Sequence, residues 1–305
     1  MAENNQEAGA VESKKQKTPW YEVLQRIDRR IIYLIVFILV SIPFFVPIPM
    51  RLEISPVVRA LYDRIEQIAE ENRRTGQQKF VLLAMDWSPS VKAENEPQTA
   101  AIIEHLFRRG VKFIIMSHLM PEGPMMAEVL AERIAKRLGK TYGIDWVNFG
   151  FRQMRTADFR AFVKDIYSMI SADYRGTPIR DIPVMKNVNS LRDVPLVFCA
   201  TGSGAYMYWV YYAQPEANCD IGVGVTAIIG PSVRPLIDSG QVVGMMEGLS
   251  GAAQYEQLLK RPDQGSRGMA SQNLAHLWII VAMALGNIGY LVSRRREKKR
   301  LKELA

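Results

Sequence analysis

Twenty consecutive residues without a formal charge, residues 31–50, constrain this chain more than any other feature of its sequence. As a helix, a run of this length rises about 30 Å, which matches the hydrocarbon thickness of a bilayer. Large apolar side chains occupy nearly every position on all faces, as is typical of a helix in lipid. The run is too long for the apolar part of a signal peptide. We therefore predict a first transmembrane helix over residues 31–50, kinked or ended near its exit by Pro43, Pro47 and Pro49.

A second uncharged stretch lies near the C-terminal end of the chain. Its apolar part predicts a second transmembrane helix over residues 273–293. Small residues permit close helix approach, and a side-chain amide can bond across helices in lipid. Gly286, Asn287 and Gly289 are therefore candidate contacts with another membrane helix. A bond from Asn287 to its own backbone or to a lipid headgroup is the open alternative.

Basic residues flank the outer ends of both predicted helices. Residues 1–30 contain six Lys or Arg, and residues 294–305 contain seven against two acidic residues. The positive-inside rule makes both tails cytoplasmic and residues 51–272 extracytoplasmic, in a two-pass protein of the plasma (inner) membrane. The net charge of +8 comes mainly from the C-terminal tail and not from the folded domain. We therefore expect the lipid bilayer, and not nucleic acid, to be a partner of this chain.

The extracytoplasmic segment alternates between two kinds of pattern. Residues 55–77 have apolar positions at helical spacing and predict a helix, either a stalk that leads out of the membrane or a helix that packs on the domain. Six apolar runs follow, each with a helical stretch after it, which predicts a doubly wound α/β domain with a mostly parallel sheet of about six strands. A connection with several Pro and Arg residues, 171–194, suggests a possible subdivision. The predicted strands are 80–85, 112–116, 146–151, 195–199, 221–228 and 242–246, and the helices are 97–109, 121–138, 157–170, 203–213, 232–238 and 251–259.

Polar residues gather where the predicted strands end, which is where open α/β sheets bind ligands. After the fourth strand, a turn with two glycines would let a carboxylate or phosphate approach the free amides of a helix start. A capped turn between strand and helix is the simpler alternative for these residues, and a loop cap or salt bridge is the alternative for Asp86. The ligand-binding candidates are Asp86, Ser117, His118, Thr201, Gly202, Ser203, Gly204, Gly248 and Ser250.

Two cysteines and three histidines offer little material for a metal site, and no phosphate-binding motif is present. We therefore expect neither a metal nor a cofactor. Cys199 and His118 both follow predicted strands at the same sheet edge, so they are the candidates for a nucleophile–base dyad. Cys199 ends one strand whereas Cys219 begins the next, which places them at opposite edges. We predict that both thiols are free.

The predicted helix 203–213 contains four tyrosines and one tryptophan. Packing in the core explains such a composition. A subunit interface is the alternative, because aromatic residues concentrate in interface cores. Tyr206 and Trp209 share one helical face and are the interface candidates of the domain.

These features favour one class of function over two others. Anchoring at both ends and the weak catalytic motifs favour a non-enzymatic subunit or scaffold of a membrane assembly, either a homo-oligomer or a complex with other membrane-protein subunits. A solute-binding or sensor domain with its ligand at the C-terminal ends of the strands is the alternative. However, twelve residues after the second helix are too few for an output domain. A hydrolase that uses Cys199 and His118 is the third hypothesis.

Overall fold

The computed structural model describes residues 19–46, 48 and 50–304 of the chain. Val46–Ala270 form one compact unit, and residues up to Phe45 together with those from Ser271 form a second. The segment 171–194, where the sequence suggested a possible subdivision, lies inside the first unit and contains three short 3-10 turns. The first 18 residues of the predicted N-terminal tail, 1–30, lie outside the described residues.

A six-stranded sheet forms the centre of the first unit, and every pair of neighbouring strands is parallel. The strand order is β3-β2-β1-β4-β5-β6, so the chain adds strands outward from β1 on one side and from β4 on the other. The predicted parallel sheet is therefore confirmed. The strands are β1 (Phe80–Asp86), β2 (Lys112–Ser117), β3 (Trp146–Phe151), β4 (Leu196–Thr201), β5 (Asp220–Val225) and β6 (Gly244–Glu247).

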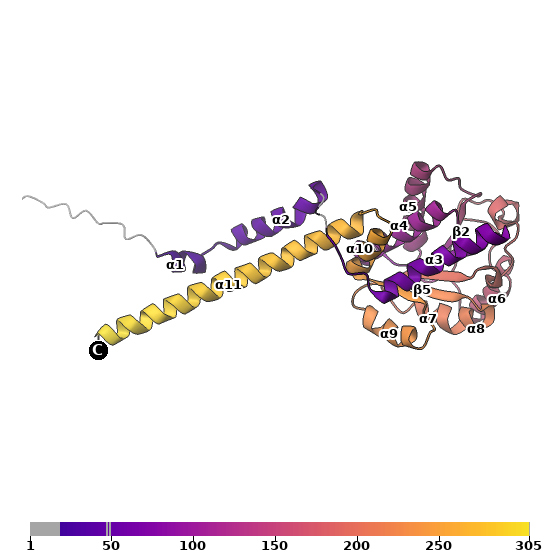
Figure 1. The fold of residues 1–305 in the computed structure, drawn as a ribbon. Coiled ribbons are helices and arrows are strands. Elements are labelled where there is room, and N and C mark those ends of the chain that lie inside the picture. Colours follow the sequence, from indigo (N-terminus) through magenta and orange to yellow (C-terminus); the bar gives the residue numbers. More distant parts are fainter. Residues whose placement is uncertain (1–18, 47, 49, 305) are drawn as a thin grey trace, which may run out of the picture. The chain divides into compact units, whose positions relative to one another are not determined.

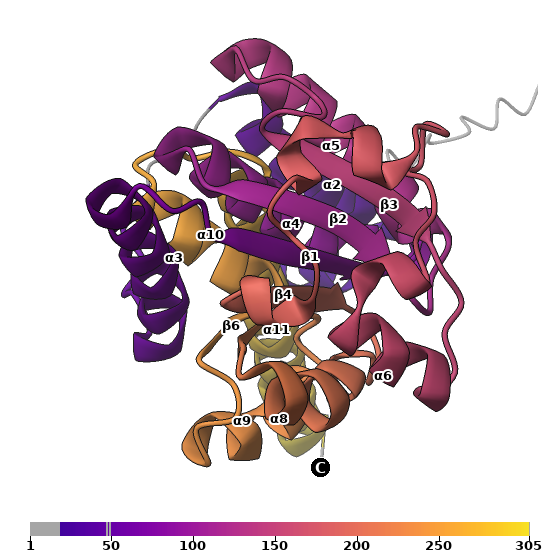
Figure 2. The ribbon, with the colours of Figure 1, turned by 90° about the vertical axis from the view of Figure 1, so that its right-hand side faces the viewer.

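Helices cover both faces of this sheet, as expected of a doubly wound fold (Figures 1 and 2). Successive residues of a strand enter opposite layers, so Leu82 lies in one core cluster and Val81 in the other. Helices α3, α4, α5 and α10 pack on the face of Val81, whereas α6 to α9 pack on the face of Leu82. The predicted stalk helix, α3, therefore packs on the domain, which was the alternative interpretation. The helices are α3 (Pro56–Thr75), α4 (Lys92–Arg109), α5 (Glu122–Leu138), α6 (Thr156–Lys164), α7 (Tyr206–Tyr208), α8 (Gln214–Ala217), α9 (Gly230–Asp238) and α10 (Gly248–Leu258).

Two helix boundaries of the α/β domain differ by five residues or more from those predicted. α4 begins at Lys92 because a 3-10 turn leads directly into it, so Pro97, the predicted first residue, lies in its second turn. α6 ends at Lys164 and not at residue 170. There the carboxylate of Asp165 accepts the backbone N–H of Tyr167 at 2.9 Å and starts a separate 3-10 turn.

The aromatic segment after β4 belongs to the core. Tyr206 and Trp209 are both buried in the cluster on the face of Leu82. The structure therefore places these two interface candidates in the interior, because their shared face lies over the sheet and not toward solvent. The residues Trp209–Ala213 form a π-helical segment, a geometry that is frequent at functional sites.

The second unit is helical. Helix α11 contains a stretch long and apolar enough to cross a membrane, and it continues as helix through the basic tail. α2 ends at Phe45, five residues before the end of the predicted span 31–50. Of the three prolines in that predicted span, Pro43 lies inside α2, and those at positions 47 and 49 lie outside the described residues. The hydroxyl of Ser271 donates to the carbonyl of Val40 at 2.8 Å, which links α11 to α2. The helices of this unit are α1 (Trp20–Gln25), α2 (Arg29–Phe45) and the larger part of α11 (Gln264–Leu304).

Both cysteines are free and buried, as predicted. In the β4–β5 register Cys199 lies opposite Val223, four residues beyond Cys219, which separates the two thiols by about 13 Å along the strands. Burial raises the pKa of Cys219 to about 12 and that of Cys199 well above its usual value. Both thiols are therefore protonated at neutral pH.

We expect neither cysteine of the native protein to react with iodoacetamide at pH 8, because the thiolate is the nucleophile and both thiols are buried and protonated. After denaturation, both should be alkylated. Mass spectrometry without reduction measures the number of labels and any cross-link. A linked pair of peptides containing Cys199 and Cys219 would contradict the strand register.

Candidate functional site

The sheet has its topological switch point between β1 and β4, where ligands of open α/β folds usually bind. Asp86 ends β1 and Thr201 ends β4, and the two are direct register partners. Ser117 ends the next strand, β2, and His118 follows it. The structure therefore brings most of the predicted ligand-binding residues to one edge of the sheet.

Asp86 uses its carboxylate to hold the loop after β2. Oδ1 accepts the hydroxyl of Ser117 at 2.6 Å and the backbone N–H groups of His118 and Leu119 at 3.0 and 2.9 Å. Burial raises the pKa of a carboxyl group, but the contacts with His118, Ser117 and Leu119 outweigh it and hold the pKa of Asp86 below its ordinary value. Asp86 is therefore an ionised group whose oxygens are already engaged by its own chain.

His118 lies fully enclosed beside this carboxylate. Its Nδ1 is 3.0 Å from Oδ2 of Asp86, which fixes the orientation of the ring. Phe159, Tyr208 and Trp209 surround the imidazole with their rings at 5.0 to 5.6 Å between centroids. Nε2 has no hydrogen-bond partner among the described residues. An aspartate–histidine pair is therefore present, but aromatic side chains cover it.

Cys199 and His118 do not form a dyad within the described chain. No hydrogen bond joins the thiol to the imidazole, and Nδ1 of His118 faces Asp86 instead. Burial and the nearby charge of Asp86 raise the pKa of Cys199. A nucleophilic cysteine requires the opposite shift.

The glycine turn after β4 is satisfied by its own side chains. Oγ1 of Thr201 accepts the backbone N–H of Ser203 at 3.0 Å and lies 3.0 Å from the hydroxyl of that residue. A Cβ on Gly202 would come within 2.7 Å of the side chain of Val91, so this glycine permits close packing. Space around Gly204 is open. These contacts agree with the simpler of the two predictions, a capped turn between strand and helix.

The start of α4 closes the ends of β4, β5 and β6. The amide nitrogen of Asn95 donates to the carbonyl of Gly224 at 3.1 Å, and that of Gln98 donates to the carbonyls of Val225 and Gly248 at 2.9 and 3.0 Å. Neither amide was predicted, because the expected helix began at Pro97. Their spacing of three residues, which places them on one helical face, was the available signal.

The remaining strand-end candidates lie beside this closure. Gly248 has a left-handed backbone (φ 58°), and a Cβ there would come within 2.9 Å of the carboxylate of Glu94. The hydroxyl of Ser250 accepts the side-chain amide of Gln254 at 3.1 Å. Both residues are therefore engaged by contacts within the domain.

A second cluster of polar residues lies away from the strand ends and was not predicted. The buried carboxylate of Glu104, on α4, contacts Arg108 at 2.7 Å, Arg261 at 2.6 Å, and Arg137. Burial raises the pKa of Glu104, but the contacts with Arg137 and Arg261 lower it by more. The pKa of Glu104 therefore lies below its ordinary value. Arg108 is four residues along the same helix, but Arg137 and Arg261 are 33 and 157 positions away, so no local pattern indicates the full cluster.

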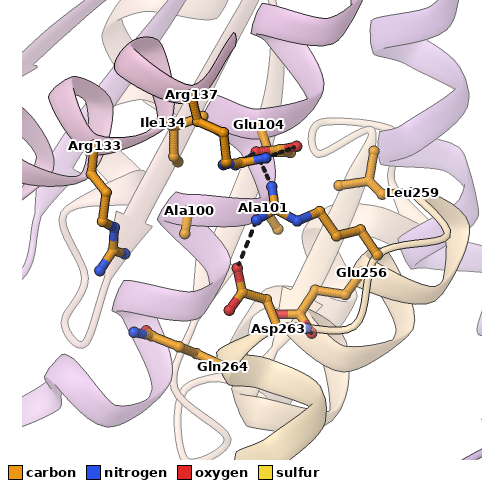
Figure 3. A pocket seen from close by; sticks show the side chains of 11 residues that line it. Ala100, Ala101, Glu104, Arg133, Ile134, Arg137, Glu256, Leu259, Asp263 and Gln264 are labelled. Atoms are coloured by element: carbon orange, nitrogen blue, oxygen red, sulfur yellow. Dashed lines mark hydrogen bonds and ion pairs between the residues drawn. The ribbon is translucent and has the colours of Figure 1, made fainter.

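A cavity of about 330 Å³ opens beside Glu104, and Figure 3 shows the side chains that line it. Arg133 extends into it without an ion-pair partner in the described chain. Acidic and basic residues are balanced in the lining, which gives the cavity no preference for one charge. The charged residues that line it are Glu104, Arg133, Arg137, Glu256, Arg261 and Asp263.

The comparisons with known proteins and the search for metal ligands add no assignment. No family model matches the sequence, and no curated protein matches it. Among the described residues, no group of three His, Cys, Asp or Glu side chains is placed to hold a metal ion. Any function must therefore be argued from the geometry itself.

Replacing Asp86 with asparagine should lower the free energy of unfolding by about 2–3 kcal/mol at pH 7, because a buried charge-assisted network loses its charge. The folded-state pKa of Asp86 is depressed, so the stability that the carboxylate contributes is fully present above the ordinary pKa of an aspartate and is lost as the pH falls through the lower folded-state pKa. The difference between wild type and Asp86→Asn should therefore narrow toward pH 2.

Urea unfolding of the detergent-solubilised chain at several pH values measures this difference. Asp238→Asn is a matched control, because Asp238 is exposed. Equal stability of wild type and Asp86→Asn at pH 7 would show that the carboxylate does not hold the β2 loop.

Proposed function

We propose that the chain is a two-pass membrane protein whose extracytoplasmic α/β domain is a non-enzymatic subunit or scaffold of a membrane assembly. The observation that carries the proposal is the uncovered apolar surface of α2 and α11. Large side chains such as Phe37, Ile280 and Met283 are 69%, 60% and 57% exposed. In water such surfaces are strongly unfavourable, whereas lipid covers them without cost.

The charges at the helix ends support the proposed orientation. Arg29 and Arg30 begin α2, and Arg294 to Arg296 follow the apolar stretch of α11. Basic residues of this kind favour the cytoplasmic side, which places both tails in the cytoplasm and the α/β domain outside the plasma membrane.

A side chain of α11 supports assembly with another membrane helix. Asn287 lies exposed within the apolar stretch, and a Cβ on the adjacent Gly286 would meet nothing within 4 Å. An amide in hydrocarbon requires a hydrogen-bond partner, and a small neighbour lets a second helix approach closely. Gly289, the third candidate, is buried and therefore less accessible to such a partner.

The strand-end geometry supports a role without catalysis. Oδ1 of Asp86 and the side-chain nitrogens of Asn95 and Gln98 form hydrogen bonds with groups of the same chain, whereas Oδ1 of Asn95 has no partner among the described residues. A hydrolase would need a nucleophile beside a base, and the thiol of Cys199 has no such contact with His118. The domain therefore offers its surface, rather than a strand-end catalytic centre, for function.

Solute binding is the second candidate, and one observation favours it. Nε2 of His118 is buried without a partner inside an aromatic enclosure. A small ligand with a hydrogen-bond donor would satisfy this nitrogen if the half-buried ring of Tyr208 moved aside. Heteronuclear NMR of His118 during ligand screening distinguishes this candidate, because only ligand binding would shift the Nε2 resonance.

Assembly is tested by native mass spectrometry after extraction in a mild detergent. We expect complexes larger than one chain of 34.6 kDa. The Asn287→Leu variant should dissociate at least fivefold more readily, since an interhelical hydrogen bond is worth about 1 kcal/mol. Met283→Leu, an apolar exchange on the same helix, is the control.

Trp209→Ala separates assembly from folding. Because Trp209 is buried, this variant should lose about 3–5 kcal/mol of stability, whereas its folded fraction should keep the wild-type oligomeric state. A wild-type protein that stays a single chain in native extracts would contradict the proposed assembly.

A further inference from the structure

Two adjoining cavities border the loop between α10 and α11. One, of about 480 Å³, is mainly apolar and is lined by Met50, Leu52, Ala253 and Pro262. The other, of about 350 Å³, is lined by Arg108, Arg109 and Lys260. Lys260 lines both, and no acidic residue lines either. An apolar chamber thus adjoins a cationic chamber, which is the pattern that an amphiphile with an anionic head requires.

The cationic chamber keeps an excess of positive charge. Arg108 contacts Glu104 and the carbonyl of Leu259 through two of its nitrogens, and Arg109 contacts Glu66 through one, so both keep further N–H donors. The ammonium group of Lys260 has no acidic side chain within 4.0 Å in the described part of the chain.

The histidine in this chamber adds no charge at neutral pH. His105 lies between the hydroxyl of Tyr255 at 2.7 Å and the carboxylate of Glu66 at 2.9 Å. Burial lowers the pKa of His105 to about 4, more than the contact with Glu66 raises it. The positive charge therefore comes from the arginines and from Lys260.

The apolar chamber lies next to both connections to the proposed membrane helices. Met50 is five residues beyond the end of α2, and Ser266, which also lines this chamber, is in the first turn of α11. The apolar stretch of α11 begins near Leu274, eight residues after Ser266 in the sequence. Short segments of chain therefore connect this chamber to both proposed membrane helices.

We propose that the two chambers together bind one anionic glycerophospholipid of the outer leaflet, with its phosphate against Lys260, Arg108 and Arg109 and the start of an acyl chain beside Met50 and Leu52. The inference rests on the proposed membrane anchorage. The combined volume of the two cavities lies within the range of ordinary ligand sites. The cationic chamber matches the phosphate of the lipid, and the apolar chamber matches its acyl chain. Bound lipid would link the domain to the membrane surface.

Native mass spectrometry of the full-length chain in detergent tests this site. The protein is incubated with phosphatidylglycerol, with phosphatidylcholine of the same acyl chains, or with inorganic phosphate. We expect retention of one phosphatidylglycerol, with at least tenfold lower occupancy by phosphatidylcholine. Lys260→Asn should reduce phosphatidylglycerol retention at least fivefold.

The variants separate binding from folding. Lys260 has a left-handed backbone (φ 52°), which asparagine tolerates, so Lys260→Asn should fold normally. Lys186→Asn is the matched control, because Lys186 is exposed and lies in neither chamber. Met50→Asn tests the apolar chamber and should weaken retention of both lipids.

Results that differ from these expectations would contradict the proposed lipid site. Equal retention of the two lipids, or retention that Lys260→Asn leaves unchanged, would remove the anionic headgroup site. Binding of inorganic phosphate without retention of lipid would assign the cationic chamber to a soluble phosphate compound. In all of these cases the chain would still be an integral membrane protein, whereas release from membranes by carbonate at pH 11 would contradict the anchorage itself.

Discussion

One buried carboxylate fixes the start of α11 to the α/β domain. Glu256, on α10, accepts the backbone N–H groups of Asp263, Gly265 and Ser266, each at 2.8 Å. These are donors that the first turn of a helix leaves without partners, and the helix dipole favours a negative charge there. Burial raises the pKa of Glu256 more than these hydrogen bonds lower it. The loop that the carboxylate holds in place borders the Glu104 cavity and both chambers of the proposed lipid site.

The sequence predicted the sheet well because parallel strands buried on both faces are continuous apolar runs, a local signal. It failed where the structure depends on distant contacts. The boundary of α4 was wrong because Pro97 has the usual signature of a helix start, although α4 already begins at Lys92. For Tyr206 and Trp209 the sequence left core packing and a subunit interface open, and their burial agrees with core packing.

The candidate site was predicted in part. Asp86, Ser117 and His118 follow neighbouring strands, so strand alternation was enough to bring them together. Their contacts could not be predicted, because the same carboxylate serves equally to bind a ligand or to hold a loop. Beyond the pair of Glu104 and Arg108 on α4, the cluster had no local signal, since Arg137 reaches it from α5 and Arg261 from the loop after α10. Most polar groups at the strand ends hold the domain together, whereas Lys260, which has no acidic partner among the described residues, lies beside the connections to the proposed membrane helices.

Cysteine accessibility tests the two-pass anchorage most directly. Cys199 and Cys219 are buried, so they give little background labelling. Ile228→Cys places a thiol on the domain at a position that is 88% exposed, and Lys302→Cys places one in the C-terminal tail. The account predicts that a membrane-impermeant maleimide labels position 228 in intact spheroplasts and position 302 only after permeabilisation. Labelling of position 302 in intact spheroplasts, or protection of position 228, would contradict it.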